Sequence, residues 1–249
     1  MRWQWIHLTL LTVSIHQTFA QDLDLNSLTD AEFRTKADPL ARALPLAMGG
    51  FFAGDANFLS SGDFRLSVSM EFNLPSDELA VGPLNGVNQF SLPIFQAAIG
   101  IDRRAELTGK FSAVNIGNRS VIITGYGLRF KAVSNEEDDR GLTFGAMVTA
   151  LRGPEDFRIL DMTVQVEYNR KWSTRGFKAA VGTDFSEMRI NVKAEEEGNL
   201  RTDQKEIIAR TQFWLGIGMS QDLGEIVFLF VQLQQSKTQR INLGLGIRL

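Results

Sequence analysis

The chain has 249 residues, a formal net charge of −3 at pH 7, no Cys and two His. The mildly acidic balance gives no reason to expect a nucleic-acid partner, and the lack of Cys excludes a disulfide framework or a lipid-modified Cys. Both histidines, His7 and His16, lie in a segment that we expect to be removed, so the mature chain would lack the residues of Ser-His triads, Cys-His pairs and the usual zinc sites.

Residues 1–20 have the pattern of a secretory signal peptide. Arg2 supplies a positive charge, a short apolar stretch runs from Ile6 to Ile15, and Ala20 offers a small residue before the predicted cut at Gln21. The apolar stretch is too short for a membrane anchor. No later segment approaches the roughly 20 apolar residues that a spanning helix needs, so entry into a membrane would have to use strands.

Residues 21–62 are predicted to form a linker with one short helix. Asp38 before Pro39 is a plausible helix start, and Gly49-Gly50 would end the helix. Its apolar positions share one face: Leu40, Ala43, Leu44 and Ala47. Pro45 keeps any helix here short or kinked. The segment could plug a barrel or lie on the periplasmic side as a packed linker, and the sequence leaves both open.

Residues 63–249 alternate between apolar and polar side chains, which predicts strands. The clearest stretches are 63–74, 157–172 and 241–249. Weaker ones are 93–102, 105–115, 121–133, 142–151, 177–194, 207–219 and 225–235. We therefore expect an all-β fold, an antiparallel up-and-down transmembrane barrel of about ten strands, with roughly eight to twelve allowed by the pattern. In 177–194 the apolar parity changes near Phe185, which predicts a bulge or an unrecognised turn.

The glycines indicate which face points inward. Most glycines in the predicted strands share the parity of the polar residues, and Gly109 is an exception: Gly100, Gly125, Gly127, Gly145, Gly182, Gly216, Gly218, Gly244 and Gly246. Glycine suits a polar face that curves into a narrow lumen, where space is short. The apolar face is nearly free of charge in the best strands, as contact with hydrocarbon requires.

The polar face would line the lumen with charges of both signs. The lumen-facing candidates are Arg65, Glu71, Glu106, Lys110, Arg129, Lys131, Asp161, Glu167, Arg189, Arg240 and Arg248, with Lys178 and Lys193 on the same parity. These charges could line a pore that selects solutes, or could pair in a packed interior. Barrels of about eight strands are filled and wide channels appear near sixteen, so a barrel of about ten favours a filled or very narrow lumen.

Aromatic residues and connection lengths give the expected position in the bilayer. Tyr168, Trp172 and Phe177 would form one interfacial girdle, and Trp214 falls on the lumen parity as a packing residue. If both ends of the barrel are periplasmic, the segments 75–92 and 195–205 become outer loops. The acidic run 135–140 then falls among the periplasmic turns, which are usually short.

The chain ends on the pattern Ile-x-Leu-x-Leu-x-Ile-x-Leu, from Ile241 to Leu249. At this point it resembles bacterial outer-membrane β-barrel proteins, whose terminal strand closes the barrel and carries an assembly signal, although that family typically ends in an aromatic residue. The resemblance is one of architecture and rests on no family-specific motif. It implies export to the outer membrane, with outer-membrane lipid and, through the C-terminal strand, the barrel-assembly machinery as partners.

The leading hypothesis is an outer-membrane barrel that serves as a structural surface protein or as a narrow passive conduit for small molecules, with the solute unspecified. The alternative is a soluble periplasmic barrel that binds an apolar ligand inside. A carboxylate enzyme is disfavoured, because Asp161 and Glu167 lie too far apart along one strand to touch. The acidic runs 136–139 and 195–197 lack calcium-loop spacing and are read as solvated loops. We therefore expect no catalytic residue, no metal and no cofactor.

Overall fold

The computed structural model describes residues 41–45, 47–49, 52, 58–75, 89–116, 119–135, 139–152, 157–193 and 203–249. The predicted signal peptide, the helix start at Asp38 and the acidic run 195–197 lie outside these residues, as does most of the run 136–139. No helix among the described residues is long and apolar enough to cross a membrane.

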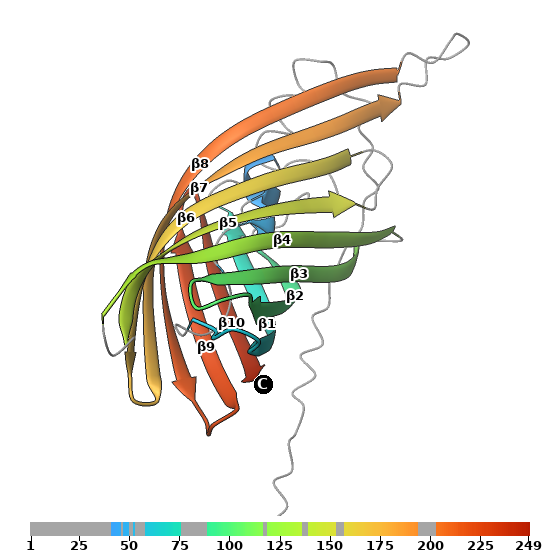
Figure 1. Ribbon diagram of the computed structural model, residues 1–249. Coiled ribbons are helices and arrows are strands. Elements are labelled where there is room, and N and C mark those ends of the chain that lie inside the picture. Colours follow the sequence, from blue (N-terminus) through green and yellow to red (C-terminus); the bar gives the residue numbers. More distant parts are fainter. Residues whose placement is uncertain are drawn as a thin grey trace, which may run out of the picture.

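The strands form one closed barrel of ten antiparallel strands (Figure 1). They are β1 (Phe64–Pro75), β2 (Phe90–Gly100), β3 (Ala105–Ile116), β4 (Arg119–Ser134), β5 (Arg140–Arg152), β6 (Phe157–Trp172), β7 (Arg175–Lys193), β8 (Asp203–Asp222), β9 (Val227–Gln235) and β10 (Thr238–Arg248). Each strand pairs with its neighbours in the chain, and β1 pairs with β10 from Arg65↔Arg248 to Pro75↔Thr238. The predicted fold class and strand number are confirmed.

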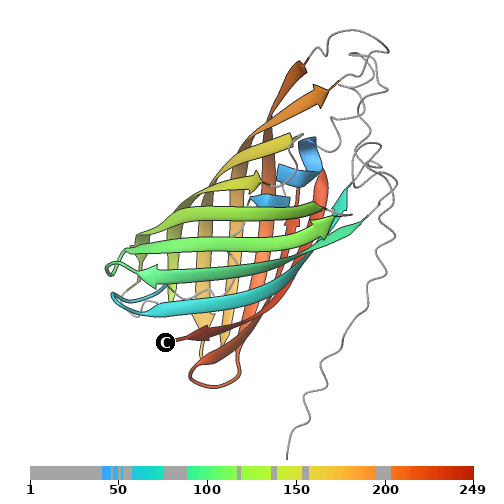
Figure 2. The same ribbon diagram turned by 90° about the vertical axis from the view of Figure 1, so that its right-hand side faces the viewer.

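The connections differ at the two ends of the barrel. The start of β1 and the end of β10 share an end with the connections 101–104, 135–139, 173–174 and 223–226, and we call this the terminus end. The opposite end, which we call the loop end, carries the long connections 76–89 and 194–202 together with three short ones. Strand order therefore places the acidic connection 135–139 at the terminus end, with no error in the strand count. Figure 2 shows β7 and β8 projecting furthest at the loop end.

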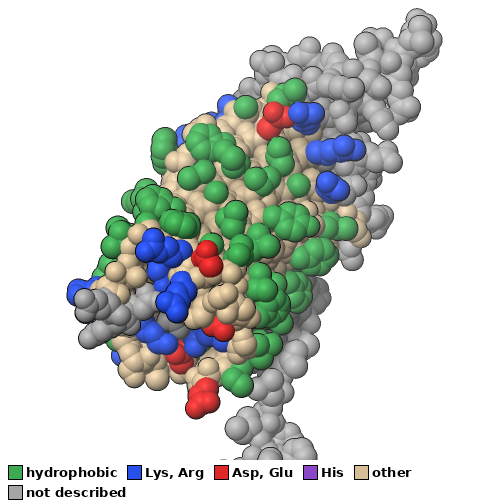
Figure 3. Space-filling view, in the orientation of Figure 1, with side chains coloured by type: hydrophobic (Ala, Val, Ile, Leu, Met, Phe, Trp, Pro, Cys, Tyr) green, Lys and Arg blue, Asp and Glu red, His purple; other side chains and the backbone are tan. Residues whose placement is uncertain are grey.

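Burial alternates along each strand, but the exposed side chains are the apolar ones. In β6 the side chain of Val164 is 43% exposed, whereas its neighbours Thr163 and Gln165 are buried. Figure 3 shows hydrophobic side chains spread over the visible wall, with charged side chains gathered toward its ends. A soluble barrel places its apolar face inside. The alternative of a soluble barrel with an apolar core is therefore wrong, and the outer wall is built to contact hydrocarbon.

A charge on this wall tests the membrane contact directly. We expect Val164→Lys, at the centre of β6, to cost about 2–4 kcal/mol and to lower the yield of folded barrel in the membrane fraction. The matched control is Val133→Lys, since Val133 is also outward but lies at the terminus end of β4, where the same change costs about 0–1 kcal/mol. Equal losses at the two positions would contradict the assignment of the wall to lipid.

Strand β7 runs without a break, so the bulge or turn predicted near Phe185 is wrong. It pairs with β6 and β8 in continuous register on both sides. The apolar parity changes because the surroundings change: Met188 faces inward and is buried, whereas Glu187 and Arg189 face outward near the loop end. Arg189, predicted to face the lumen, is 66% exposed and pairs with Glu187 on the outer face. The parity switch had placed Arg189 on the wrong side.

The predicted girdle lies at the terminus end. Trp172 and Phe177 meet across the 173–174 turn with ring centroids 6.4 Å apart. Tyr168 is exposed on the same outward face of β6, two outward positions before Trp172. The guanidinium of Arg170 lies 4.6 Å from the Trp172 ring centroid. Amphipathic rings and cations at this depth match the boundary between hydrocarbon and headgroups.

Candidate functional site

The described residues of the segment 41–59 lie inside the barrel, and we call them the plug: residues 41–45, 47–49, 52, 58 and 59. The plug helix comprises residues 41–45 and 47–48, and Figures 1 and 2 show it in blue within the loop end of the barrel. Its last turn closes with Gly49 N donating to Pro45 O at 2.7 Å. Of the two placements left open by the sequence, the structure has the plug.

Apolar side chains around the helix form a collar at the loop end. Ala41, Ala43, Leu44, Ala47 and Met48 of the helix are buried, so it is enclosed on more than one face. The inward residues that pack with it come from β2 and β4 to β8: Phe90, Leu92, Ile94, Val121, Ile123, Leu151, Ile159, Met188 and Ile208. A helix that is apolar around its circumference is stable only when enclosed in this way.

Below the helix, basic side chains of the wall bind the main chain of the plug. Lys110 Nζ donates to Met48 O and, at 3.5 Å, to Gly49 O. Arg240 Nη1 donates to Gly49 O at 2.8 Å and lies 3.4 Å from Glu71 Oε1. The positive charges of β3 and β10 thus meet the carbonyl oxygens at the end of the plug helix, where the helix dipole is negative.

On the opposite wall, two carboxylates share one hydroxyl. Thr163 Oγ1 lies 2.6 Å from Asp184 Oδ1 and 3.2 Å from Asp161 Oδ2, and Trp214 Nε1 donates to Asp184 Oδ1 at 3.2 Å. A Cβ placed on Gly49 would overlap the Asp161 carboxylate and lie 2.6 Å from Thr163 Oγ1. A side chain at position 49 would therefore require the side chains of Asp161 and Thr163 to move.

The middle of the lumen is filled by Phe52. Its carbonyl oxygen accepts hydrogen bonds of 3.1 Å from Lys178 Nζ and from Gln232 Nε2. Its ring occupies the space that side chains at Gly127 and Gly145 would take, since a Cβ on Gly127 would lie 2.9 Å from the ring and one on Gly145 would overlap it. The prediction that luminal glycines mark short space is confirmed here, and the ring belongs to the plug.

This contact predicts a coupled pair of substitutions. We expect Gly145→Ala to destabilise the barrel by about 1–3 kcal/mol, because the new Cβ overlaps the Phe52 ring. In the Phe52→Ala background the same change should cost far less, which a double-mutant cycle of urea unfolding, followed by Trp fluorescence, would detect. Gly109→Ala is the matched control, since a Cβ on Gly109 meets nothing within 4 Å. Additive effects of the first two substitutions would contradict the contact.

Toward the terminus end, a buried ion network crosses the lumen. Arg129 Nη1 lies 2.7 Å from Glu106 Oε2, and Arg129 Nη2 lies 2.8 Å from Glu167 Oε2. Arg65 Nη2 lies 3.3 Å from the same oxygen of Glu106, and Leu59 N of the plug donates to Glu106 Oε1 at 2.6 Å. All four charged side chains are at most 2% exposed. The network joins β1, β3, β4 and β6 to the plug.

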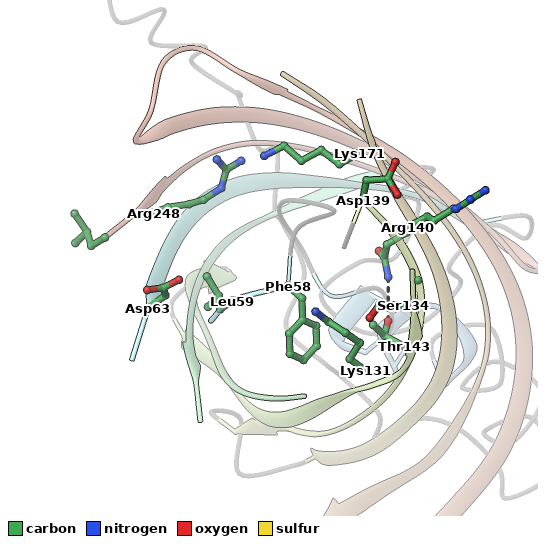
Figure 4. A pocket seen from close by; sticks show the side chains of 13 residues that line it. Phe58, Leu59, Asp63, Lys131, Ser134, Asp139, Arg140, Thr143, Lys171 and Arg248 are labelled. Atoms are coloured by element: carbon green, nitrogen blue, oxygen red, sulfur yellow. Dashed lines mark hydrogen bonds between the residues drawn. The ribbon is translucent and has the colours of Figure 1, made fainter. Parts of the chain in front are cut away.

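A cavity of about 480 Å³ opens at the terminus end, and we call it the vestibule (Figure 4). Its lining is Phe58, Leu59, Asp63, Lys131, Ser134, Asp139, Arg140, Gly141, Thr143, Asn169, Lys171, Arg248 and Leu249. Figure 4 shows Phe58 beside Lys131, whose Nζ lies 4.9 Å from the ring centroid. Arg248 and Lys171 point toward each other and share Asp222, at 2.5 and 3.6 Å. The lining has four basic side chains and two acidic ones, and two of the basic ones are paired with Asp222, so we assign no solute class to the vestibule.

The structure brings most of the sequence-predicted lumen residues together inside. The buried ones are Arg65, Glu71, Glu106, Lys110, Arg129, Asp161, Glu167 and Arg240, with Lys178 beside them. Lys131 and Arg248 are half-buried at the vestibule, and Arg189 is the one candidate with a described side chain that lies on the outer face. The side chain of Lys193 lies outside the described ones. Asp161 and Glu167 belong to separate clusters at different depths. Sequence reasoning missed Asp184, Phe52 and Phe58, although Asp184 shares the parity of Gly182.

No family model and no curated protein sequence matches the chain. Among solved structures, an outer membrane channel from Pseudomonas putida F1 aligns over 80% of this chain and 100% of that one, with 10% identity and a TM-score of 0.42. The outer membrane protease OmpT from Escherichia coli aligns over 78% and 97%, with 7% identity and a TM-score of 0.42. The N-terminal β-barrel domain of Pseudomonas aeruginosa OprF aligns over 77% and 100%, with 10% identity and a TM-score of 0.34. These similarities are too low to assign a role, so the role must come from the chain's own residues.

Proposed function

We propose that this chain is an outer-membrane barrel that serves as a narrow conduit for small solutes and is held closed by its plug. One observation carries the proposal: in the middle of the lumen the strands leave a space at Gly127 and Gly145 that the plug fills. Small barrels are usually filled by the side chains of their own strands. In this barrel much of the inner wall presents glycine, serine and threonine, and the Phe52 ring of the plug occupies the space in the middle.

The polar wall also fits a lumen that holds water. On the inner face of β1, β3 and β5, the buried side chains of Asn73, Thr108, Ser112 and Thr149 have no hydrogen-bond partner among the described residues. Buried polar groups of this kind are normally satisfied by protein or by ordered water. The plug itself is held by a few side-chain hydrogen bonds, each worth about 0.5–1.5 kcal/mol, or about 1.5–3 kcal/mol with a charged donor.

The test is conductance in a planar lipid bilayer. We expect the intact chain to give little steady current and a chain that lacks residues 21–59 to give discrete steps. A milder variant, Lys178→Met with Gln232→Leu, removes both donors to Phe52 O and should give transient openings. Each variant is first shown to be a closed barrel by its faster electrophoretic migration before boiling. A closed barrel that lacks residues 21–59 and stays silent would reject the conduit.

A second candidate is a structural surface protein with a permanently filled interior. The specific observation in its favour is the ion network of Arg65, Glu106, Arg129 and Glu167, which spans the lumen and is buried. These four side chains come from strands and not from the plug, so they stay when the plug is removed. Silent deletion variants that keep their stability would support this role.

A further inference from the structure

The path of the plug has a consequence for the chain that precedes it. At the terminus end, the chain enters β1 through a turn in which Gly62 N donates to Gly100 O at 2.9 Å, and Phe64 exchanges 2.8 Å hydrogen bonds with Leu249. Just before this turn, Leu59 is bound by Glu106, the inward residue of β3 nearest the terminus end. The C-terminal end of the plug, at Leu59, therefore lies at the terminus end of the barrel.

Toward lower residue numbers, the plug runs along the lumen from the terminus end to the loop end. Phe52 lies at the level of Gly127 and Gly145, in the middle of β4 and β5. Gly49 lies at Asp161 and Thr163, closer to the loop end of β6. The helix packs on Phe90, Val121 and Leu151, which are respectively the first residue of β2, an early residue of β4 and a late residue of β5, all at the loop end.

The lumen leaves no return path beside the plug. Its middle is occupied by Phe52, Trp214 and the luminal charges, all of them buried. Ala41 is buried in the collar, and Arg42, bound through its carbonyl oxygen by Gln212 at 3.0 Å, is half-exposed. A chain that continues toward its N-terminus from this point meets the loop end, the face opposite to the start of β1.

We infer that the chain is threaded through its own barrel, so that the residues before Ala41 emerge at the loop end. Barrels of this kind place their longer loops at the cell surface and their short turns in the periplasm, so the mature N-terminal segment, residues 21–40 by the predicted cut, is displayed outside the cell. The segment is acidic, with Asp22, Asp24, Asp30, Glu32 and Asp38 against Arg34 and Lys36. This inference stands whether or not the barrel conducts.

The chain has no Cys, so single Cys substitutions report their side of the membrane cleanly. Three are made: Ala37→Cys before the plug, Lys237→Cys in the exposed β9–β10 turn at the loop end, and Glu225→Cys in the exposed β8–β9 turn at the terminus end. Intact cells are treated with a polyethylene-glycol maleimide too large to cross the outer membrane, and labelling is compared with that of permeabilised cells.

We expect Ala37→Cys to label in intact cells to the same extent as Lys237→Cys, and Glu225→Cys to label only after permeabilisation. If the barrel were inserted in the opposite orientation, the labelling of Ala37→Cys would still match that of Lys237→Cys, because both positions would lie at the loop end. Labelling that follows Glu225→Cys would overturn the inference, because the segment would then lie on the terminus side. Labelling of Ala37→Cys only after denaturation would overturn it too, since the segment would then be enclosed. Faster migration before boiling shows in each case that the barrel is folded.

Discussion

A disulfide between positions 49 and 163 is expected to form without added oxidant and to fix the plug in the lumen. The reason is geometric: a Cβ on Gly49 would lie 2.6 Å from Thr163 Oγ1, and in a disulfide the Cβ of one Cys lies about 3 Å from the sulfur of the other. The Asp161 carboxylate, which this Cβ would overlap, has to turn away. The periplasm is oxidising, and the chain contains no competing thiol. Gly49→Cys with Thr163→Cys should therefore migrate differently from either single variant on denaturing electrophoresis without reductant.

The disulfide should change stability and conductance together. It closes a loop of roughly 100 residues, which in the chain-entropy model stabilises the folded state by about 4–5 kcal/mol. Introduced into the Lys178→Met, Gln232→Leu variant, it should abolish the transient openings, and dithiothreitol should restore them. The Thr163→Cys single variant is the control, because it also loses the hydroxyl that meets Asp184 and Asp161. Openings that persist in the oxidised double-Cys protein would show that the plug does not gate the lumen.

Alternation of side chains was sufficient to predict the barrel, because a membrane barrel imposes one environment on each face along most of a strand. The strands with the clearest alternation, such as β6, appear where they were expected. The same rule predicted the luminal charges, since Arg129 and Glu167 could avoid lipid only by facing inward. Ten strands follow once each alternating stretch is counted as one strand.

The errors arise where the environment changes along a strand. In β7, Met188 is apolar but faces inward, because at that depth the lumen holds the apolar plug helix and not water. A rule that assigns apolar residues to lipid then reverses the faces from Phe185 onward, and it placed Arg189 in the lumen. Nothing in the pattern of β7 itself reveals the collar, since the collar depends on a helix far away in the sequence.

The role of the plug also could not be predicted from local sequence patterns. Phe52 lies in a segment without strand or helix periodicity. Its contacts are with residues far along the sequence, such as Gly145 in β5 and Gln232 in β9. The polar wall binds the main chain of the plug, at Met48 O, Gly49 O and Phe52 O, so no complementary side-chain motif marks the segment. Only the luminal glycines carried a signal, namely that something large had to occupy the space beside them.

Loss of Arg129 is expected to destabilise the barrel by about 3–5 kcal/mol, because removing one partner of a buried ion pair leaves an uncompensated charge. Among the described residues, Arg129→Met would leave Glu167 with the neutral hydrogen-bond partners Thr143 and Gln165, and Glu106 with its ion pair to Arg65. Both acids would keep the electrostatic attraction of Lys178. Urea unfolding in lipid vesicles, followed by the fluorescence of the buried Trp214, measures the loss.

Two further variants separate the buried charges from a general effect of losing a cation. The quadruple variant Arg65→Met, Glu106→Gln, Arg129→Met, Glu167→Gln removes both acids together with both of their cations, so most of the stability should return. Lys171→Met removes a cation whose own side chain is 37% exposed in its pair with Asp222, and a pair at the surface contributes only about 0–1 kcal/mol. A quadruple variant as unstable as Arg129→Met would show that packing of the charged side chains, and not their charge, stabilises this part of the lumen. With the four charges of the network removed and the barrel intact, the same quadruple variant also tests whether the network blocks conduction once residues 21–59 are deleted.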